Sequence, residues 1–247
     1  MFKLIKYELR KQWFSKLFML IVMGILELTF LFNLLRDKKD ALGITIAIMT
    51  LFSFAAIMFV SFECIMTYSK DLKTKQSYML FLTPNSTYKI IGAKVITSVA
   101  QIGITAAVMI SLVFFNMSVV LVRYKDIDNM IQIIQRMMKE MMGLNVDYGL
   151  IVIAIVAFLL EWISKVIMGM LAITLSATFL SNTKGKGIVS LILFFVLNYI
   201  VGRIGKLFVL ESTAMFDKFM IDAIVMAFVI AAFYLATAWM LDKKVSV

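Results

Sequence analysis

Apolar residues in this chain gather in long blocks that are separated by short polar segments. A block of about 18 or more apolar residues is long enough to cross a lipid bilayer as a helix. Six blocks are predicted to be membrane spans: residues 17–35, 41–66, 92–122, 150–180, 187–208 and 219–241. The pattern therefore predicts an all-α membrane protein whose residues 1–247 form a single transmembrane domain of about six helices.

Two features of these blocks predict departures from simple spans. The third and fourth blocks exceed the about 20 residues that a crossing needs, so we expect these helices to tilt or to extend beyond the bilayer. The second half of the fifth block is interrupted by Gly202, Arg203, Gly205 and Lys206. These residues indicate a broken or re-entrant helix, of the kind that occurs where a membrane helix lines a cavity.

The composition removes several classes of function. Hydrophobic residues make up 62% of the chain, with a mean hydropathy of +0.97, whereas soluble domains have about 45–50% apolar residues. Cys64 is the sole cysteine, which excludes an intrachain disulfide and a cysteine metal cluster. The chain has no histidine, which removes the commonest general base, the usual catalytic triads and most zinc sites.

The positions of lysine and arginine predict the orientation of the spans. With a cytoplasmic N-terminus, the inner segments hold 14 of the 25 basic residues and the outer segments hold 10. We therefore expect a multi-pass protein of a bacterial plasma membrane, with both termini in the cytoplasm. The net charge of +10 gathers on the inner segments, where it suits anionic lipid rather than nucleic acid.

Residues 1–16 are predicted to form an amphipathic helix on the inner membrane surface. A cleaved signal peptide is not expected, because the charged stretch is long and the apolar block after it exceeds a signal-peptide core. The helix has an apolar arc and a neighbouring basic arc: Phe2, Ile5, Leu9 and Trp13, then Lys3, Lys6 and Arg10. Such a helix sinks its apolar side chains into the headgroup boundary. The alternative is a basic anchor without a defined helix.

The outer segment 123–149 contains a second amphipathic stretch, residues 129–142. Its apolar half includes Met130, Met137, Met138 and Met141. Flexible methionine side chains suit a lid over the outer mouth that touches an amphipathic substrate. A soft-metal site is the alternative, but the sulfur atoms are mixed with isoleucines and the chain lacks histidine.

Residues 67–94 form the longest inner segment and contain the only proline. Thr83-Pro84-Asn85-Ser86 is a turn signal, and Ser86 is suited to cap the helix that becomes the third span. The preceding residues, 69–82, mix charges with an apolar end, which suits a short helix that presents a face to another protein. The alternative is an ordinary connecting loop, although about 25 residues is long for one.

This segment resembles the loop between the second and third spans of ABC-2 type transporter permeases. The resemblance is carried by a group of residues that match the family's pattern: Tyr68, Asp71, Leu80, Leu82, Thr83, Pro84, Asn85, Ser86, Ile90, Ile91 and Lys94. Gln76 departs from it, because the family often has glycine near this position. Six spans, the basic N-terminal helix and the chain length extend the resemblance to short permeases, which include subunits of exporters for antimicrobial peptides and phenol-soluble modulin-like toxins.

The resemblance implies a coupling helix within residues 67–91 that docks on a separate ATPase subunit. Its expected contacts are Asp71, Lys73, Lys75, Tyr78, Pro84, Asn85 and Ser86. ATP and magnesium would bind to the ATPase, and this chain would be a permease subunit that is not itself an enzyme and binds no cofactor. The chain's nearest approach to a phosphate-binding loop, residues 181–187, lacks the required spacing and terminal hydroxyl.

Polar residues inside the predicted spans are the other candidates for function, because charges there are costly. They are Glu27, Glu161, Lys165, Asn198 and a stripe of Lys94, Ser98, Gln101 and Thr105. Glu161 and Lys165 are four residues apart and are predicted to pair on one helix face. These side chains suit either a substrate pathway with a surface for a second copy of the chain, or internal neutralisation and helix pairing without substrate contact.

The leading hypothesis is the membrane subunit of an ATP-driven exporter that assembles with a second copy or a similar permease. Its substrate would be amphipathic, with a peptide favoured over a lipid or drug. An ion-coupled secondary transporter is the alternative, in which Glu161 or Glu27 would carry a proton. An intramembrane enzyme is less favoured, because the acidic residues within the spans stand singly and far apart.

Overall fold

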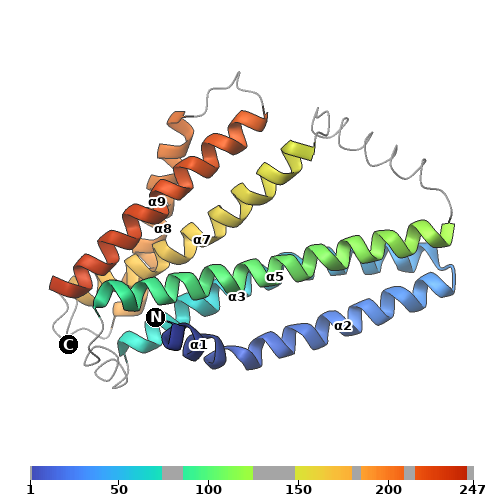
Figure 1. The fold of residues 1–247 in the computed structure, drawn as a ribbon, viewed down its shortest axis with the longest axis horizontal. Coiled ribbons are helices and arrows are strands. Elements are labelled where there is room, and N and C mark those ends of the chain that lie inside the picture. The colour runs from blue at the N-terminus through green and yellow to red at the C-terminus, as the bar shows by residue number, and fades with distance from the viewer. Residues whose placement is uncertain (1, 74–85, 125–147, 180–184, 209–214, 244–247) are drawn as a thin grey trace. The chain divides into compact units, whose positions relative to one another are not determined.

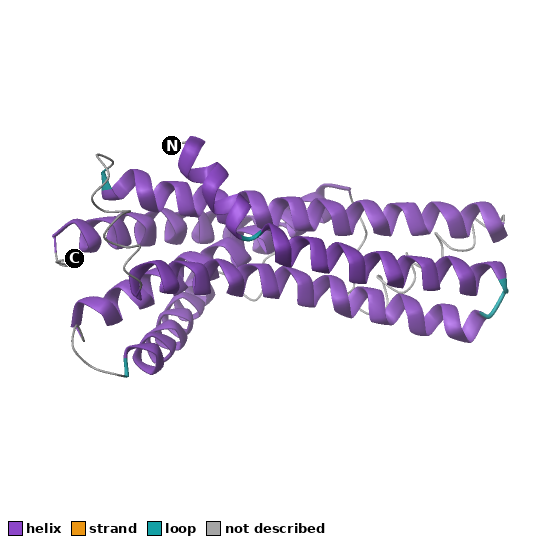
Figure 2. Ribbon diagram, turned by 90° about the horizontal axis from the view of Figure 1, so that it is seen from below, coloured by secondary structure: helices purple, strands orange, loops and turns teal. Residues whose placement is uncertain are grey.

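The computed structural model describes residues 2–73, 86–124, 148–179, 185–208 and 215–243, and among these it contains helices and turns without strands (Figure 2). Seven helices are found in these ranges: α1 (Phe2–Lys11), α2 (Trp13–Leu35), α3 (Lys39–Lys73), α5 (Thr87–Tyr124), α7 (Tyr148–Phe179), α8 (Lys186–Phe208) and α9 (Met215–Lys243) (Figure 1). The predicted all-α fold is confirmed.

Six of these helices are long and apolar enough to cross a membrane, so the chain is a multi-pass membrane protein. The candidate spans are Trp13–Leu35, Asp40–Leu72, Thr87–Val120, Gly149–Phe179, Gly187–Phe208 and Met215–Lys243, each with a mean hydropathy of 2.0 to 2.4. The helix of the second span, α3, continues past the predicted end at residue 66. The helix of the third span, α5, begins before the predicted start at residue 92. Both extensions contain charged and hydroxyl side chains, so hydrophobicity alone did not reveal them.

The fold divides into two compact units. Unit 1 contains residues 1–11, 58–102 and 153–247, and unit 2 contains residues 12–57 and 103–152. The helices α3 and α5 contribute residues to both units.

Unit 2 is built from α2, the first half of α3 and the second half of α5. A tight turn joins α2 to α3, in which the Arg36 N–H donates to the Phe32 carbonyl (3.2 Å) and Asp37 adopts a left-handed φ of 50°. Aspartate tolerates this conformation better than most residues. The Arg123 guanidinium at the end of α5 donates to Asp37 (2.9 Å), and therefore ties α5 to the turn.

Unit 1 is centred on α7. Every residue from Val166 to Ala172 is buried, which is typical of a helix that other helices surround. Within this run, Met168 packs with Val201 of α8 and Met226 of α9 in one apolar cluster. The three helices α7, α8 and α9 lie beside one another in this unit (Figure 1).

The helix α8 corrects one expectation. It is continuous over residues 186–208 and passes through Gly202 and Gly205 without a break. A helix tolerates isolated glycines when its own hydrogen bonds are kept. The Arg203 guanidinium lies 5.9 Å from the centre of the Tyr199 ring, so part of its charge is accommodated against an aromatic face.

The N-terminal helix is shorter than predicted. α1 ends at Lys11 and α2 begins at Trp13, so residues 13–16 belong to the first span. Within α1, Glu8 is buried, while Lys6, Tyr7 and Arg10 are exposed. The face of α1 that packs on the protein therefore includes an acidic residue, which is explained by the ion pairs described below.

A close approach between α3 and α7 depends on Gly169. A β-carbon built at this position would lie 2.7 Å from Ile65 Cδ1, 2.8 Å from its Cγ1 and 3.1 Å from its Cγ2. These distances are shorter than ordinary contacts, and the β-branched isoleucine has little freedom to move aside. Glycine at position 169 is therefore required for this packing.

We predict that Gly169→Ala destabilises the protein by about 1–3 kcal/mol, because it overpacks the contact with Ile65. Thermal unfolding of the detergent-purified protein, followed by tryptophan fluorescence, measures the change. Gly103→Ala is the matched control, since nothing lies within 4 Å of a β-carbon at Gly103. Ile65→Ala in the Gly169→Ala background should recover part of the loss. Equal effects of the two glycine substitutions would contradict the packing argument.

Candidate functional site

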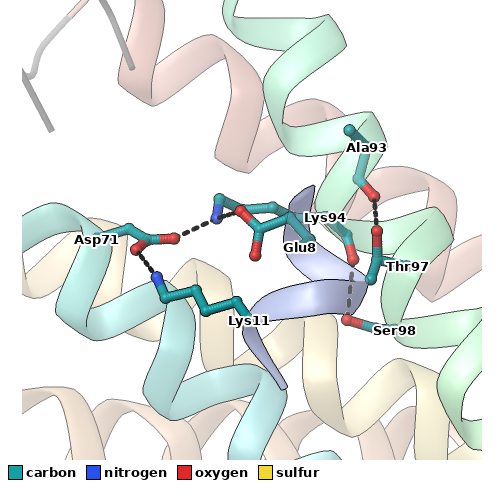
Figure 3. Close-up of polar contacts among 7 residues, drawn as sticks. All are labelled: Glu8, Lys11, Asp71, Ala93, Lys94, Thr97 and Ser98. Carbon is teal, nitrogen blue, oxygen red and sulfur yellow. Dashed lines mark hydrogen bonds and ion pairs between the residues drawn. The ribbon is translucent and has the colours of Figure 1, made fainter. Parts of the chain in front are cut away.

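Four charged side chains from three helices meet inside unit 1 (Figure 3). We call Glu8 and Lys11 of α1, Asp71 of α3 and Lys94 of α5 the ion-pair network. The Lys94 ammonium donates to Glu8 Oε1 (2.6 Å) and to Asp71 Oδ2. The Lys11 ammonium donates to Asp71 Oδ1 (2.5 Å). The network therefore joins α1 to the end of α3 and the beginning of α5.

Three residues of the network are buried, Lys11 lies at its exposed edge, and the charges balance. The side chain of Lys94 is 6% exposed, that of Glu8 8%, that of Asp71 12% and that of Lys11 28%. A buried charge is costly unless a partner neutralises it, and here two ammonium groups face two carboxylates. Lys94 contacts the carboxylates of both Glu8 and Asp71, so the network depends most on this residue.

A second contact fixes the end of α3. One turn before Asp71, the Tyr68 hydroxyl lies 2.6 Å from Thr174 Oγ1 of α7, and both residues are fully buried. The Thr174 hydroxyl donates its proton to the Met170 carbonyl (2.9 Å). Tyr68 must therefore be the donor in the contact with Thr174. The last turns of α3 are thus held to α7 by Tyr68 and to α1 and α5 by Asp71.

The beginning of α5 is fixed as well. Thr87 in its first turn donates to Asp242 of α9 (2.8 Å), and Tyr234 of α9 donates to the Tyr88 carbonyl (3.0 Å). Ser86 is exposed and occupies the predicted capping position, since its carbonyl accepts the first backbone bonds of α5. Both helix ends that flank residues 74–85 are therefore tied to other helices of unit 1.

The predicted polar stripe of α5 lies on a buried face. Lys94, Ser98 and Gln101 are buried, while Thr105 is half-buried. Ser98 donates to the Lys94 carbonyl (2.9 Å), and the Cys64 thiol donates to Gln101 Oε1 at 3.6 Å. Lys94 and Gln101 therefore contact side chains of other helices, whereas the hydroxyl of Ser98 bonds within α5.

The predicted pair within the fourth span is confirmed. Lys165 donates to Glu161 Oε1 (2.8 Å), and its ammonium lies 4.9 Å from the centre of the Trp162 ring. Sequence reasoning missed Asp222 of α9, which interacts electrostatically with both Glu161 and Lys165. The Ser164 hydroxyl also contacts the Met226 sulfur at 3.5 Å, one turn further along both helices. Asp222 was detectable as an acidic residue within the sixth predicted span.

The remaining predicted residues are placed as follows. Glu27 of α2 contacts Asn116 of α5, and Asn198 is exposed on α8. The α3 helix ends at Lys73, whose side chain is not described. The others lie outside the described residues: Lys75, Tyr78, Pro84, Asn85, Met130, Met137, Met138 and Met141. Their predicted roles in ATPase coupling and in an outer lid stay predictions.

No protein-family model, curated protein or solved structure matches this chain. Function must therefore be inferred from the spans and from the contacts between them. Among the residues that the structure describes, no group of three or more acidic or cysteine side chains is placed to hold a metal ion.

The chemistry of the ion-pair network favours a mechanical role. Each carboxylate is neutralised by a lysine, and the hydrogen bonds span 60, 86 and 23 residues of sequence. Such an arrangement fixes the relative positions of three helix segments in a low-dielectric interior, where charged hydrogen bonds are strong.

We predict that Lys94→Met costs about 3–5 kcal/mol of stability, because it leaves the buried carboxylates of Glu8 and Asp71 without their shared cation. The loss is measured as a fall in the apparent Tm of the purified protein. Adding Asp71→Asn should recover part of it by removing one of the two negative charges. Lys89→Met changes an exposed lysine of the same helix and is the control. A Lys94→Met protein as stable as this control would show that the network adds nothing.

Proposed function

We propose that this chain is the membrane-spanning permease subunit of an exporter that is driven by ATP hydrolysis on a separate subunit. The observation that supports this most is the buried ion pair between Asp71 and Lys94. Both residues belong to the segment 67–94 that resembles the coupling loop of ABC-2 permeases, and they lie on either side of residues 74–85. A segment that transmits force needs firmly attached ends, and the contacts of Asp71 and Lys94 supply this attachment.

In this proposal, residues 67–91 receive the movement of the ATPase and pass it to the spans. Asp71 has a positioning role, because its carboxylate is engaged with Lys94 and Lys11 of its own chain. Contact with the ATPase would then come from residues beyond the network. These are Lys73, Lys75, Tyr78, Pro84, Asn85 and Ser86, of which Ser86 is exposed.

The proposed assembly contains two permease chains and two ATPase subunits, in the plasma membrane of a bacterium. Six spans form too small a bundle for a large pathway, so the substrate route would lie between this chain and a second copy or a similar permease. Its substrate would be an amphipathic peptide. ATP and magnesium would be held by the ATPase, and both termini of this chain would be cytoplasmic.

A second candidate function is ion-coupled transport. Three charged residues lie in the spans formed by α7 and α9: Glu161, Lys165 and Asp222. Charges within membrane spans often mark ion or proton routes. The two functions differ in their source of energy. Vanadate-sensitive hydrolysis by a co-purified ATPase favours the exporter, whereas transport by the purified chain alone along a proton gradient favours the secondary transporter.

The proposal predicts that Ser86 faces the cytoplasm and that the turn at residues 36–38 faces the exterior. Single cysteines are introduced as Ser86→Cys or Lys38→Cys, both at exposed positions, in a Cys64→Ala background. In right-side-out vesicles, a membrane-impermeant maleimide should label Lys38→Cys and leave Ser86→Cys unlabelled until the membrane is opened. Labelling of Ser86→Cys from the exterior would overturn the proposed coupling to a cytoplasmic ATPase.

The proposal also predicts that Asp71→Asn and Pro84→Ala each lower substrate-stimulated ATP hydrolysis severalfold, while the chain still inserts into the membrane. Hydrolysis is measured on the complex reconstituted in proteoliposomes with an amphipathic peptide. Asp37→Asn is the control, because it removes an exposed ion pair with Arg123 in the other unit. Unchanged stimulation in both test variants would exclude residues 67–91 from the coupling mechanism.

A further inference from the structure

A half-buried contact inside unit 2 has an unusual arrangement of hydrogen-bonding atoms. Glu27 lies in the span formed by α2, and Asn116 lies in the span formed by α5. The Asn116 amide Nδ2 donates to Glu27 Oε2 (3.2 Å). The other two oxygens of the pair, Glu27 Oε1 and Asn116 Oδ1, are buried, and neither accepts a hydrogen bond from any residue that the structure describes.

Two unsatisfied acceptors in one contact need a physical explanation. An ionised carboxylate and an amide oxygen both accept hydrogen bonds and donate none, so neither oxygen can satisfy the other. A buried acceptor without a donor is destabilising, and a bare carboxylate inside a membrane span is more so. If Glu27 is an ionised carboxylate, the contact between Glu27 and Asn116 therefore lacks one hydrogen-bond donor.

Basic side chains on the two helices do not supply this donor. The nearest ones along the sequence are Arg36, nine residues after Glu27, and Arg123, seven residues after Asn116. Seven residues of helix correspond to about 10 Å. Arg123 is also engaged with Asp37 (2.9 Å), and the Arg36 guanidinium lies over the Phe32 ring at 4.2 Å.

We propose that Glu27 and Asn116 together form a binding site for one proton, which Glu27 Oε1 carries and donates to Asn116 Oδ1. With this proton, the two side chains form a closed acid–amide pair, in which Asn116 donates to Glu27 through Nδ2 and Glu27 donates to Asn116 through Oε1. One proton therefore satisfies both unsatisfied oxygens and removes the charge from the span.

The proton on Glu27 would have a structural role and would not be transported. The acid–amide pair joins α2 to α5 within unit 2, and the enclosed proton would be held rather than passed on. Glu161, by contrast, has a lysine partner and a half-exposed side chain. The inference does not rest on the proposed function, because it concerns how two spans of this chain are held together under any mechanism.

Substitutions of Glu27 test the inference through stability. Glutamine offers an N–H donor in place of the acid O–H, so Glu27→Gln should keep the wild-type apparent Tm. Glu27→Ala and Asn116→Leu should each lower it by about 2–4 °C, because both lose the paired hydrogen bonds. The matched control is Glu8→Gln, the same chemical change at a carboxylate that neutralises a buried lysine, and it should lower the Tm.

Two outcomes of this series would overturn the inference. A Glu27→Gln protein as unstable as Glu27→Ala would show that Glu27 acts as an ionised carboxylate. Glu27→Ala and Asn116→Leu proteins with the wild-type Tm would show that the pair does not hold α2 to α5.

Infrared spectroscopy of the full chain in lipid bilayers tests the proton directly. A protonated carboxyl group has a C=O stretching band that ionised carboxylates lack. We expect this band in the wild-type protein, its loss in Glu27→Gln, and its displacement in Asn116→Leu, where the hydrogen-bond acceptor is removed. A wild-type spectrum in which Glu27→Gln removes no such band would exclude a proton on Glu27.

Discussion

A charged group buried inside a membrane protein is costly unless another group within the fold neutralises it, and the position of Lys94 shows how this constraint shapes the structure. Its ammonium group is buried between Glu8 and Asp71, which come from two other helices. Water cannot replace either partner at low cost in such a site. The packing of α1 and the positions of the ends of α3 and α5 therefore depend on one another.

This constraint explains why polar residues continue the helices beyond their apolar blocks. The extra turns of α3 carry Tyr68 and Asp71, and the first turn of α5 carries Thr87. Each of these side chains has a partner on another helix. The extensions are thus packed against other helices of unit 1.

Much of the architecture was predictable from the sequence, because long apolar blocks have few alternatives to crossing the membrane as helices. The pairing of Glu161 with Lys165 was also predictable, since residues four apart on a helix are neighbours. The partners of Lys94 were not, because Glu8 is 86 residues away and no local pattern links the two. The break expected in α8 was wrong, since glycine permits a break without requiring one.

Because Tyr68 donates the hydrogen bond to Thr174, substitutions at these two positions are expected to differ in their cost to stability. The hydroxyl proton of Thr174 is donated to the Met170 carbonyl, so Thr174 is satisfied as a donor whether or not Tyr68 is present. Phenylalanine at position 68 would remove the donor to Thr174 but would leave the hydrogen bond from Thr174 to Met170 intact. Valine at position 174 would instead strand a fully buried phenol hydroxyl beside a methyl group. Loss of the donor from α3 is therefore expected to cost less stability than loss of the acceptor from α7.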